Sequence, residues 1–120
     1  MKIVNPIAVM GENLAVKYLE KKGYVIIERN FRRRYGEIDI IAVSGKTLVF
    51  VEVKTRKSLL FGKPLESITF RKLREIMNTA QYYVLTHPKL PKLLRIDAVS
   101  ILLNKENNID TIEHVENISI

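Results

Sequence analysis

The chain has 120 residues with 47% hydrophobic content, no cysteine and a formal net charge of +7. This length and apolar content favour one folded domain over a disordered segment, and the missing cysteine excludes disulfides and thiolate metal sites. No run of about 18 or more apolar residues occurs and the first residues lack the pattern of a secretory signal, so we expect no membrane span and a cytoplasmic location.

The positive charge is concentrated in the first seven-eighths of the sequence. All 20 lysines and arginines lie at or before Lys105, and over residues 1–105 they face only 9 acidic residues, a balance of +11. A basic body of this size favours a polyanionic partner, with nucleic acid ahead of a membrane surface. A lysine-rich solvated surface is the alternative interpretation.

The first predicted element is a helix. Asn5 is a good N-cap and Pro6 suits the first helical position, and the helix is expected to run to about Lys22. Glu12 falls on the apolar stripe of this helix, so its carboxylate points toward the packed face. An unpaired charge there is costly, so Glu12 either reaches a metal site or stays near the first turn, where the helix dipole favours it.

Residues 24–28 predict the first strand, and a basic run with two aromatic side chains follows it. This run contains Arg32, Arg33 and Arg34 and is expected to be a loop. One interpretation is a loop that grips phosphates while Phe31 or Tyr35 stacks on a base. The other is a solvated loop with Phe31 in the core.

Two apolar runs, at about 37–43 and 47–56, flank a turn at residues 44–47 and predict an antiparallel hairpin. A loop of two residues and a loop of four residues give the same register, in which the numbers of opposed residues sum to 91. A three-residue loop with a bulge would shift the register by one and undo this pairing.

The predicted register opposes charged residues in the middle of an apolar hairpin. Asp39 faces Glu52, and Glu37 faces Lys54. Like charges that face each other directly are destabilising, so Asp39 and Glu52 require a proton or a cation between them. A hard divalent ion with oxygen ligands, Mg²⁺ or Mn²⁺, meets this requirement, and a solvated polar face is the alternative.

The second half of the sequence predicts a helix at about 67–86 and strands at about 94–103 and 109–115. The element order is therefore α-β-β-β-α-β-β, an α/β fold with a mixed sheet of about five strands flanked by helices. The loop at 58–64 contains Leu59-Leu60-Phe61, a candidate dimer surface whose alternative role is core packing.

Basic residues also stand at two element ends. Arg56 and Lys57 end the third strand, and Arg71, Lys72 and Arg74 lie near the start of the second helix. Because a helix dipole disfavours cations at that end, these residues indicate an anionic ligand, with a solvated face as the alternative.

Three acids and a lysine in this arrangement suit phosphodiester hydrolysis. Asp39 and Glu52 would hold the metal, which neutralises the scissile phosphate and lowers the pKa of a water molecule. Lys54 would orient or polarise that water and offset phosphate charge, with a salt bridge to Glu37 as its alternative role. Glu12 would hold a second ion or orient a ligand through water, and Glu37 would set the charge state and position of Lys54.

The segments GEIDIIA at 36–42 and VFVEVKTR at 49–56, with Gly11-Glu12 and Arg95-Ile96-Asp97, resemble the YraN-type family of small bacterial proteins. That family is similar to Holliday junction resolvases and to the PD-(D/E)XK nuclease superfamily, and the resemblance covers nearly the whole chain. It implies a restriction-endonuclease-like core in a single domain over residues 1–120.

The same resemblance implies a metal site carried by Glu12, Asp39 and Glu52, with Lys54 catalytic. Glu37 matches the Gly-Glu-Ile-Asp segment of the family, and Ile38 stands where the superfamily has proline before the aspartate. Glu37, Asp39, Glu52 and Lys54 are therefore the predicted catalytic residues.

The leading hypothesis is a metal-dependent endonuclease that acts on DNA, with branched junctions among its substrates and RNA as an alternative nucleic acid. Cutting a four-way junction symmetrically requires two sites, so a homodimer is expected in that case. The competing hypotheses are a nucleic-acid-binding module that does not cut and a small metalloenzyme acting on phosphomonoesters. The residues expected to contact nucleic acid are all basic: Arg32, Arg33, Arg34, Arg56, Lys57, Arg71 and Lys72.

Overall fold

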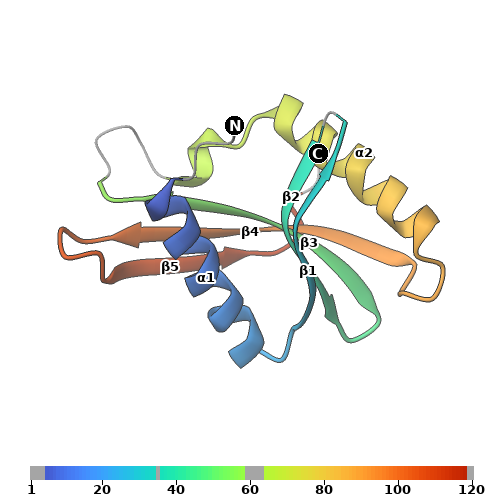
Figure 1. The fold of residues 1–120 in the computed structure, drawn as a ribbon, viewed down its shortest axis with the longest axis horizontal. Helices are drawn as coiled ribbons and strands as arrows, with labels where there is room; N and C mark the ends of the chain where they lie inside the picture. Colours follow the sequence, from blue (N-terminus) through green and yellow to red (C-terminus); the bar gives the residue numbers. More distant parts are fainter. Residues whose placement is uncertain (1–4, 35, 59–63, 119–120) are drawn as a thin grey trace.

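The computed structural model describes residues 5–34, 36–58 and 64–118. Its helices and strands are α1 (Pro6–Lys21), β1 (Val25–Arg33), β2 (Gly36–Ser44), β3 (Thr47–Arg56), the short 3₁₀ helix η1 (Pro64–Ser67), α2 (Phe70–Thr86), β4 (Leu93–Leu103) and β5 (Ile109–Val115) (Figure 1). The predicted order α-β-β-β-α-β-β and the mixed α/β class are confirmed. The candidate dimer segment at 59–61 lies outside the described residues.

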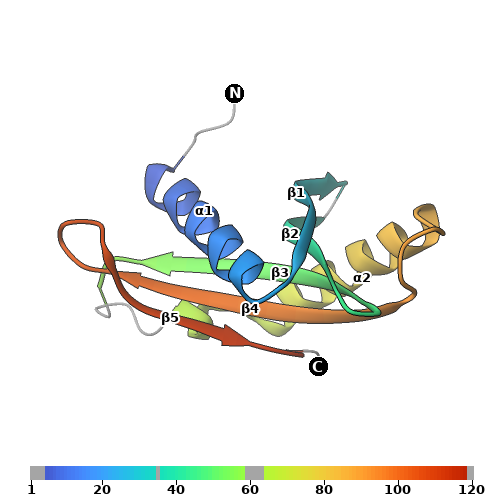
Figure 2. The same cartoon turned by 90° about the horizontal axis from the view of Figure 1, so that it is seen from below.

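The strands form one five-stranded sheet in the order β1-β2-β3-β4-β5. The β3–β4 pair is parallel and every other pair is antiparallel, because η1 and α2 carry the chain back between β3 and β4. The β1–β2 hairpin curls away from the long β3 and β4 strands toward the side of α1 (Figure 2). This divergence opens the sheet between β2 and β3, where the predicted acids lie.

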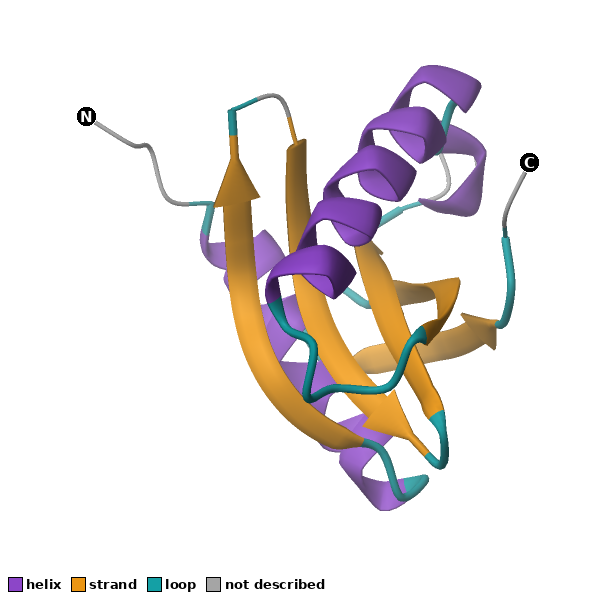
Figure 3. Cartoon of the chain, turned by 90° about the vertical axis from the view of Figure 1, so that its right-hand side faces the viewer, coloured by secondary structure: helices purple, strands orange, loops and turns teal. Residues whose placement is uncertain are grey.

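The two helices cover opposite faces of the sheet. In Figure 3, α2 crosses in front of the strands and α1 lies behind them. Each helix packs on its own apolar cluster, as expected for strands that are buried on both faces. The fully buried side chains on the α1 face include Ala15, Leu19, Ile40, Ala42, Val49 and Val51. Those on the α2 face include Ile41, Leu48, Phe50, Ala80 and Ile96.

Two local features fix α1 above the sheet. The Asn5 side chain accepts hydrogen bonds from the backbone N–H groups of Ile7 and Ala8, which confirms it as the N-cap. Gly11 is buried, and a Cβ at this position would overlap the Thr55 hydroxyl on β3. The absence of a side chain therefore lets the helix approach the strand closely and brings the next residue, Glu12, near the edge of β3.

Two predicted boundaries differ from the structure. Strand β1 runs to Arg33 rather than ending at residue 28, so most of the predicted basic loop is strand. Helix α2 begins at Phe70, with Thr69 as its N-cap, rather than at about residue 67, and the short η1 precedes it at Pro64–Ser67. In the described part of the chain, neither helix combines the length and the apolar content that a membrane crossing needs.

Candidate functional site

The β2–β3 register follows the prediction wherever the two strands pair. The pairs run from Ser44↔Thr47 to Ile40↔Val51, and in each pair the residue numbers sum to 91. The connection is a tight turn whose first residue, Gly45, has φ of +60°, which costs little for glycine. The predicted opposition of Asp39 and Glu52 is the continuation of this register.

Beyond the Ile40↔Val51 pair, the Asp39 side chain replaces the backbone of β2 as hydrogen-bond acceptor for β3. The same register would place Val53 opposite Ile38, but the Val53 N–H donates to Asp39 Oδ2 at 2.8 Å. Ile38 packs in the α2 cluster, whereas Ile40 packs in the α1 cluster, so the alternation of faces along β2 breaks at Asp39. The Asp39 carboxylate consequently lies in the gap between the two strands, within reach of side chains from both faces.

Glu52 approaches this gap from the α2 face. It follows Leu48 and Phe50 on the same face of β3, and its side chain is only 7% exposed. Its carboxylate shares a hydrogen bond with that of Asp39. Among the described residues, Glu52 Oε2 has no hydrogen-bond partner, and the Lys72 ammonium of α2 lies 3.6 Å away as an ion pair.

Burial raises the pKa of Asp39 to about 8, with the hydrogen bond and the charge of Glu52 adding to the effect. The Val53 amide works in the opposite direction but does not compensate. Without a metal, the Asp39–Glu52 pair therefore holds a proton near neutral pH. Paired carboxylates with a buried oxygen that lacks a hydrogen bond fit a hard divalent cation, because the cation satisfies that oxygen and replaces the proton.

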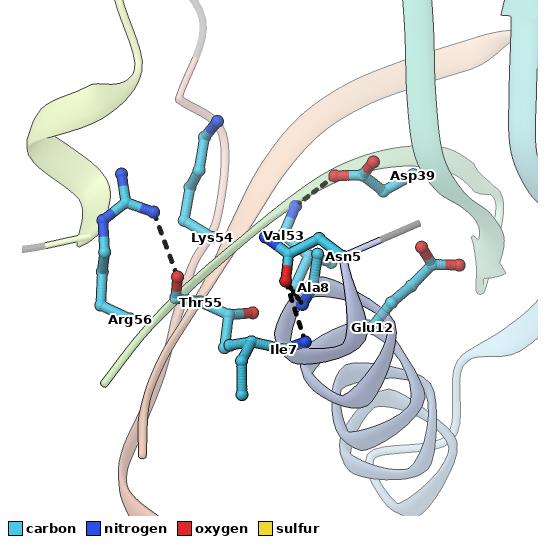
Figure 4. Close-up of a pocket in the computed structure, with 9 residues that line it drawn as sticks. All are labelled: Asn5, Ile7, Ala8, Glu12, Asp39, Val53, Lys54, Thr55 and Arg56. Carbon is cyan, nitrogen blue, oxygen red and sulfur yellow. Dashed lines mark hydrogen bonds between the residues drawn. The ribbon is translucent and has the colours of Figure 1, made fainter. Parts of the chain in front are cut away.

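A pocket of about 180 Å³ adjoins this pair and unites residues from α1, β2 and β3 (Figure 4). Glu12 reaches from α1 toward the side of the pocket on which Asp39 lies, while Lys54 extends on the other side of β3 from α1 (Figure 4). Three of the four residues of the predicted metal and lysine site thus line one pocket. Glu52 does not line it, but its carboxylate contacts that of Asp39. The lining residues are Asn5, Ile7, Ala8, Glu12, Asp39, Val53, Lys54, Thr55 and Arg56.

Glu12 has protein partners that the sequence did not indicate. Its Oε1 atom accepts hydrogen bonds from Arg29 Nε at 2.9 Å and from Asn30 Nδ2 at 3.2 Å. Asn30 has φ of +53°. Its neighbours on β1 pair with Ile40 and Ile38, so Asn30 lies beside Asp39 of β2. The charge of Glu12, with its side chain 13% exposed, is therefore compensated by Arg29, which begins the basic run of β1.

Glu37 contacts a different residue from the one expected. It is opposite Arg32 on β1, and the two side chains form an ion pair at 3.2 Å. Within the described ranges Glu37 forms no ion pair with Lys54, so the predicted Glu37–Lys54 pair is absent from this structure. The negative charge of Glu37 contributes to the raised pKa of Asp39. Glu37 therefore acts on the Asp39–Glu52 pair through its charge and not through a hydrogen bond.

The predicted nucleic-acid-binding residues divide into two groups. Arg32, Arg33 and Arg34 lie exposed at the end of the β1–β2 hairpin where β1 leads into β2, and Arg33 stacks 3.5 Å over the ring of Tyr82. The second group lies at the end of β3 and on α2. Arg56 lines the pocket and Lys57 follows it on the surface. On α2, Arg71 pairs with Glu75 across one turn and Lys72 pairs with Glu52.

A second polar cluster joins β4 to β5. Asp97, His114 and Glu116 place three potential metal-ligand atoms within 4.8 Å of one another. The fully buried Asp97 already accepts hydrogen bonds from Arg95 at 2.8 and 3.0 Å, from His114 Nε2 at 2.7 Å and from the Asn117 N–H at 3.0 Å. Because four donors occupy its oxygens, we assign Asp97 to the stability of the fold.

The protonation of this cluster follows from its partners. His114 Nδ1 lies 2.7 Å from the ammonium of Lys22, which only donates, so Nδ1 accepts and Nε2 carries the proton. Burial by itself would raise the pKa of Asp97, but the hydrogen bonds from Arg95, Asn117 and His114 outweigh burial and hold this pKa below its usual value.

The sequence matches the model of a protein family described as "Uncharacterised protein family UPF0102" over residues 11–101. The chain belongs to the UPF0102 family. UPF0102 proteins of Caldicellulosiruptor bescii and Clostridium botulinum are 51% and 44% identical to it, over 88% and 89% of this chain and 90% and 88% of theirs. The expected YraN-type membership is confirmed at this level, and the matched segment contains both acids of the pair, Glu12, Lys54 and Lys72.

Proposed function

We propose that this UPF0102 protein is a metal-dependent endonuclease of the PD-(D/E)XK type that hydrolyses phosphodiester bonds in DNA. The observation that supports this most strongly is Glu52 Oε2, a buried oxygen without a hydrogen bond, in contact through its carboxylate with Asp39. Its ion-pair partner, the Lys72 ammonium, lies at 3.6 Å, beyond hydrogen-bond distance, so a divalent cation would supply the close ligand contact that this oxygen lacks.

In this proposal Asp39 and Glu52 hold Mg²⁺ or Mn²⁺. The ion supplies charge neutralisation at the phosphate and acidifies a water molecule. Lys54 orients the attacking water and stabilises the charge that develops on phosphorus oxygens as the P–O bond to the leaving nucleoside breaks. Glu12 orients a ligand of the ion through water, since Arg29 holds its carboxylate at the pocket wall. Glu37 tunes the acidic pair by its charge.

The substrate class follows from the surrounding charge. Arg56 at the pocket and the arginines of the β1–β2 hairpin offer cations to the phosphates on either side of the cut. Four-way and flapped DNA are the proposed first substrates, and a two-fold dimer would supply the second site that symmetric cutting requires.

Cleavage of linear, flapped and four-way DNA with Mg²⁺ or Mn²⁺ tests this proposal. Glu52→Gln and Lys54→Met keep the side-chain shapes and should each lower the cleavage rate by about 100-fold or more. Glu106→Gln, in the exposed turn between β4 and β5, is the matched control and should leave the rate unchanged. Cleavage that survives Glu52→Gln would show that another site or a contaminant cuts.

A nucleic-acid-binding module that does not cut is the second candidate. The exposed arginines of the β1–β2 hairpin favour it, because phosphate contacts require no metal. DNA binding that is equal with and without metal, together with no cleavage of any substrate, would support this module. Phosphate release from mononucleotides would instead indicate a phosphomonoesterase.

A further inference from the structure

Lys72 carries its positive charge at the N-terminal end of α2, where the helix dipole disfavours a cation. The residue is in the first turn of α2, where its N–H donates to the capping Thr69 hydroxyl, and no acidic residue stands in that turn. The positive end of the helix dipole therefore opposes the Lys72 charge. The compensation comes from β3, since the Lys72 ammonium lies 3.6 Å from Glu52 Oε2.

Glu52 Oε2 is also the oxygen of the Asp39–Glu52 pair that lacks a hydrogen bond among the described residues. Asp39 Oδ2 accepts from the Val53 amide, and the two carboxylates share one hydrogen bond, whereas Glu52 Oε2 is buried without a hydrogen bond among the described residues. A divalent ion that binds this pair needs Glu52 Oε2. An ammonium so close to that oxygen repels the ion, because two cations share one low-dielectric environment.

We propose that Lys72 is a resident counter-ion of this site, which a divalent ion displaces from Glu52 and which then binds a phosphate beside the ion. This inference rests on the proposed function for the position of the ion, and it adds a coupling between metal loading and phosphate binding. The Lys72 side chain is 33% exposed, so its flexible stem has room to move its head group from Glu52 to solvent.

The neighbouring cations do not share this position. Arg71 is 87% exposed and pairs with Glu75 on its own helix. Lys54 forms no ion pair with a carboxylate in the parts of the chain that the structure describes. Lys72 is thus the cation whose charge the acidic pair holds directly, and removing it should affect metal affinity in a way that removing Arg74, an exposed cation of the same helix, does not.

Manganese titration, followed by the electron paramagnetic resonance signal of the free ion, measures this competition. Lys72→Met removes the charge and keeps the stem, and it should bind Mn²⁺ on the order of tenfold more tightly than wild type. Lys72→Arg restores the charge and should return the affinity to within about threefold of wild type, while Arg74→Met should match wild type. Circular dichroism confirms that each variant is folded.

A second measurement tests the transfer of the ammonium to phosphate. Fluorescence anisotropy of a labelled DNA oligonucleotide should show that Ca²⁺ tightens binding to wild type, and that Lys72→Met loses most of this gain. Equal Mn²⁺ affinity in wild type and Lys72→Met, or no Mn²⁺ binding by either protein, would overturn the inference.

Cleavage assays on the same samples separate the two proposals. If the Mn²⁺ affinity depends on Lys72 but no DNA is cleaved, the counter-ion proposal stands and the endonuclease proposal is wrong. If DNA is cleaved but the Mn²⁺ affinity does not depend on Lys72, the endonuclease proposal stands and the counter-ion proposal is wrong.

Discussion

Asp39 Oδ2 accepts a hydrogen bond of 2.8 Å from the backbone N–H of Val53 on the neighbouring strand. This bond satisfies an amide that the diverging strands would otherwise leave without its ladder partner. The same carboxylate shares a hydrogen bond with Glu52. Asp39 therefore both accepts the Val53 hydrogen bond that stabilises the strand pair and supplies a titrating carboxylate to the acidic pair. A substitution can separate these two roles.

Asp39→Asn should stabilise the metal-free protein while abolishing metal binding. The asparagine oxygen can still accept from Val53 and its amide can donate to Glu52, so it imitates the protonated aspartic acid without its titration. We expect the free energy of unfolding at pH 8 to rise by about 1–2 kcal/mol. Urea unfolding in the presence of a chelator measures it, and Asp110→Asn on the exposed part of β5 is the control.

The pH profile gives an independent check of the same pair. The pKa of Asp39 is raised from 3.8 in the unfolded chain to about 8, so the folded protein keeps a proton that the unfolded chain has released between these values. Unfolding free energy should therefore fall as the pH rises through this window, and the fall should be smaller in Asp39→Asn. Parallel profiles for wild type and variant would contradict a shared proton.

Asp97→Asn should destabilise the protein strongly. The change removes the buried carboxylate that Arg95 binds, leaves Arg95 with Glu116 as its anionic partner, and weakens the bond to His114. Losing hydrogen bonds between a charged acceptor and its donors at a fully buried position costs about 1.5–3 kcal/mol. Since the pKa of Asp97 is lowered, its contribution is present above about pH 4 and is lost as the pH falls through the folded value, so the variant and wild type should converge in acid.

The β2–β3 register was predictable from the sequence because side-chain alternation and a short glycine-containing turn leave few choices. That register alone is enough to predict that Asp39 and Glu52 are neighbours, and their shared hydrogen bond agrees with it. The extension of β1 was not predictable, because the basic run carries no apolar alternation and its pairing with β2 uses the backbone.

The side-chain contacts between the helices and the sheet could not be predicted from the sequence either. Glu12 contacts Arg29 from 17 positions away, and Glu52 contacts Lys72 from another element, because each contact depends on how a helix packs on the sheet. The dipole argument predicted an anionic ligand near the start of α2, and this stays a prediction. The structure shows that Lys72 pairs there with the protein's own Glu52.

Gly11→Ala should loosen the packing of α1 on β3 and displace Glu12 from the pocket wall. The added methyl group would overlap the Thr55 hydroxyl, and overpacking of this kind costs about 1–3 kcal/mol, against about 1 kcal/mol gained in helix propensity. Thermal unfolding should show a net loss, and Thr55→Ala in the same chain should recover part of it. Lys17→Ala on the exposed face of α1 is the control for propensity alone.

Arg33→Met tests whether the end of the β1–β2 hairpin where β1 leads into β2 contacts phosphate. Arg33 is exposed and its guanidinium is held 3.5 Å over the Tyr82 ring, so it loses little conformational freedom when it binds a phosphate. We expect DNA affinity to fall by about three- to tenfold and the slope of log K against log salt to decrease by about one. Lys105→Met, in the exposed β4–β5 turn, should change neither quantity, and an equal loss in both variants would indicate a general charge effect instead of a local contact.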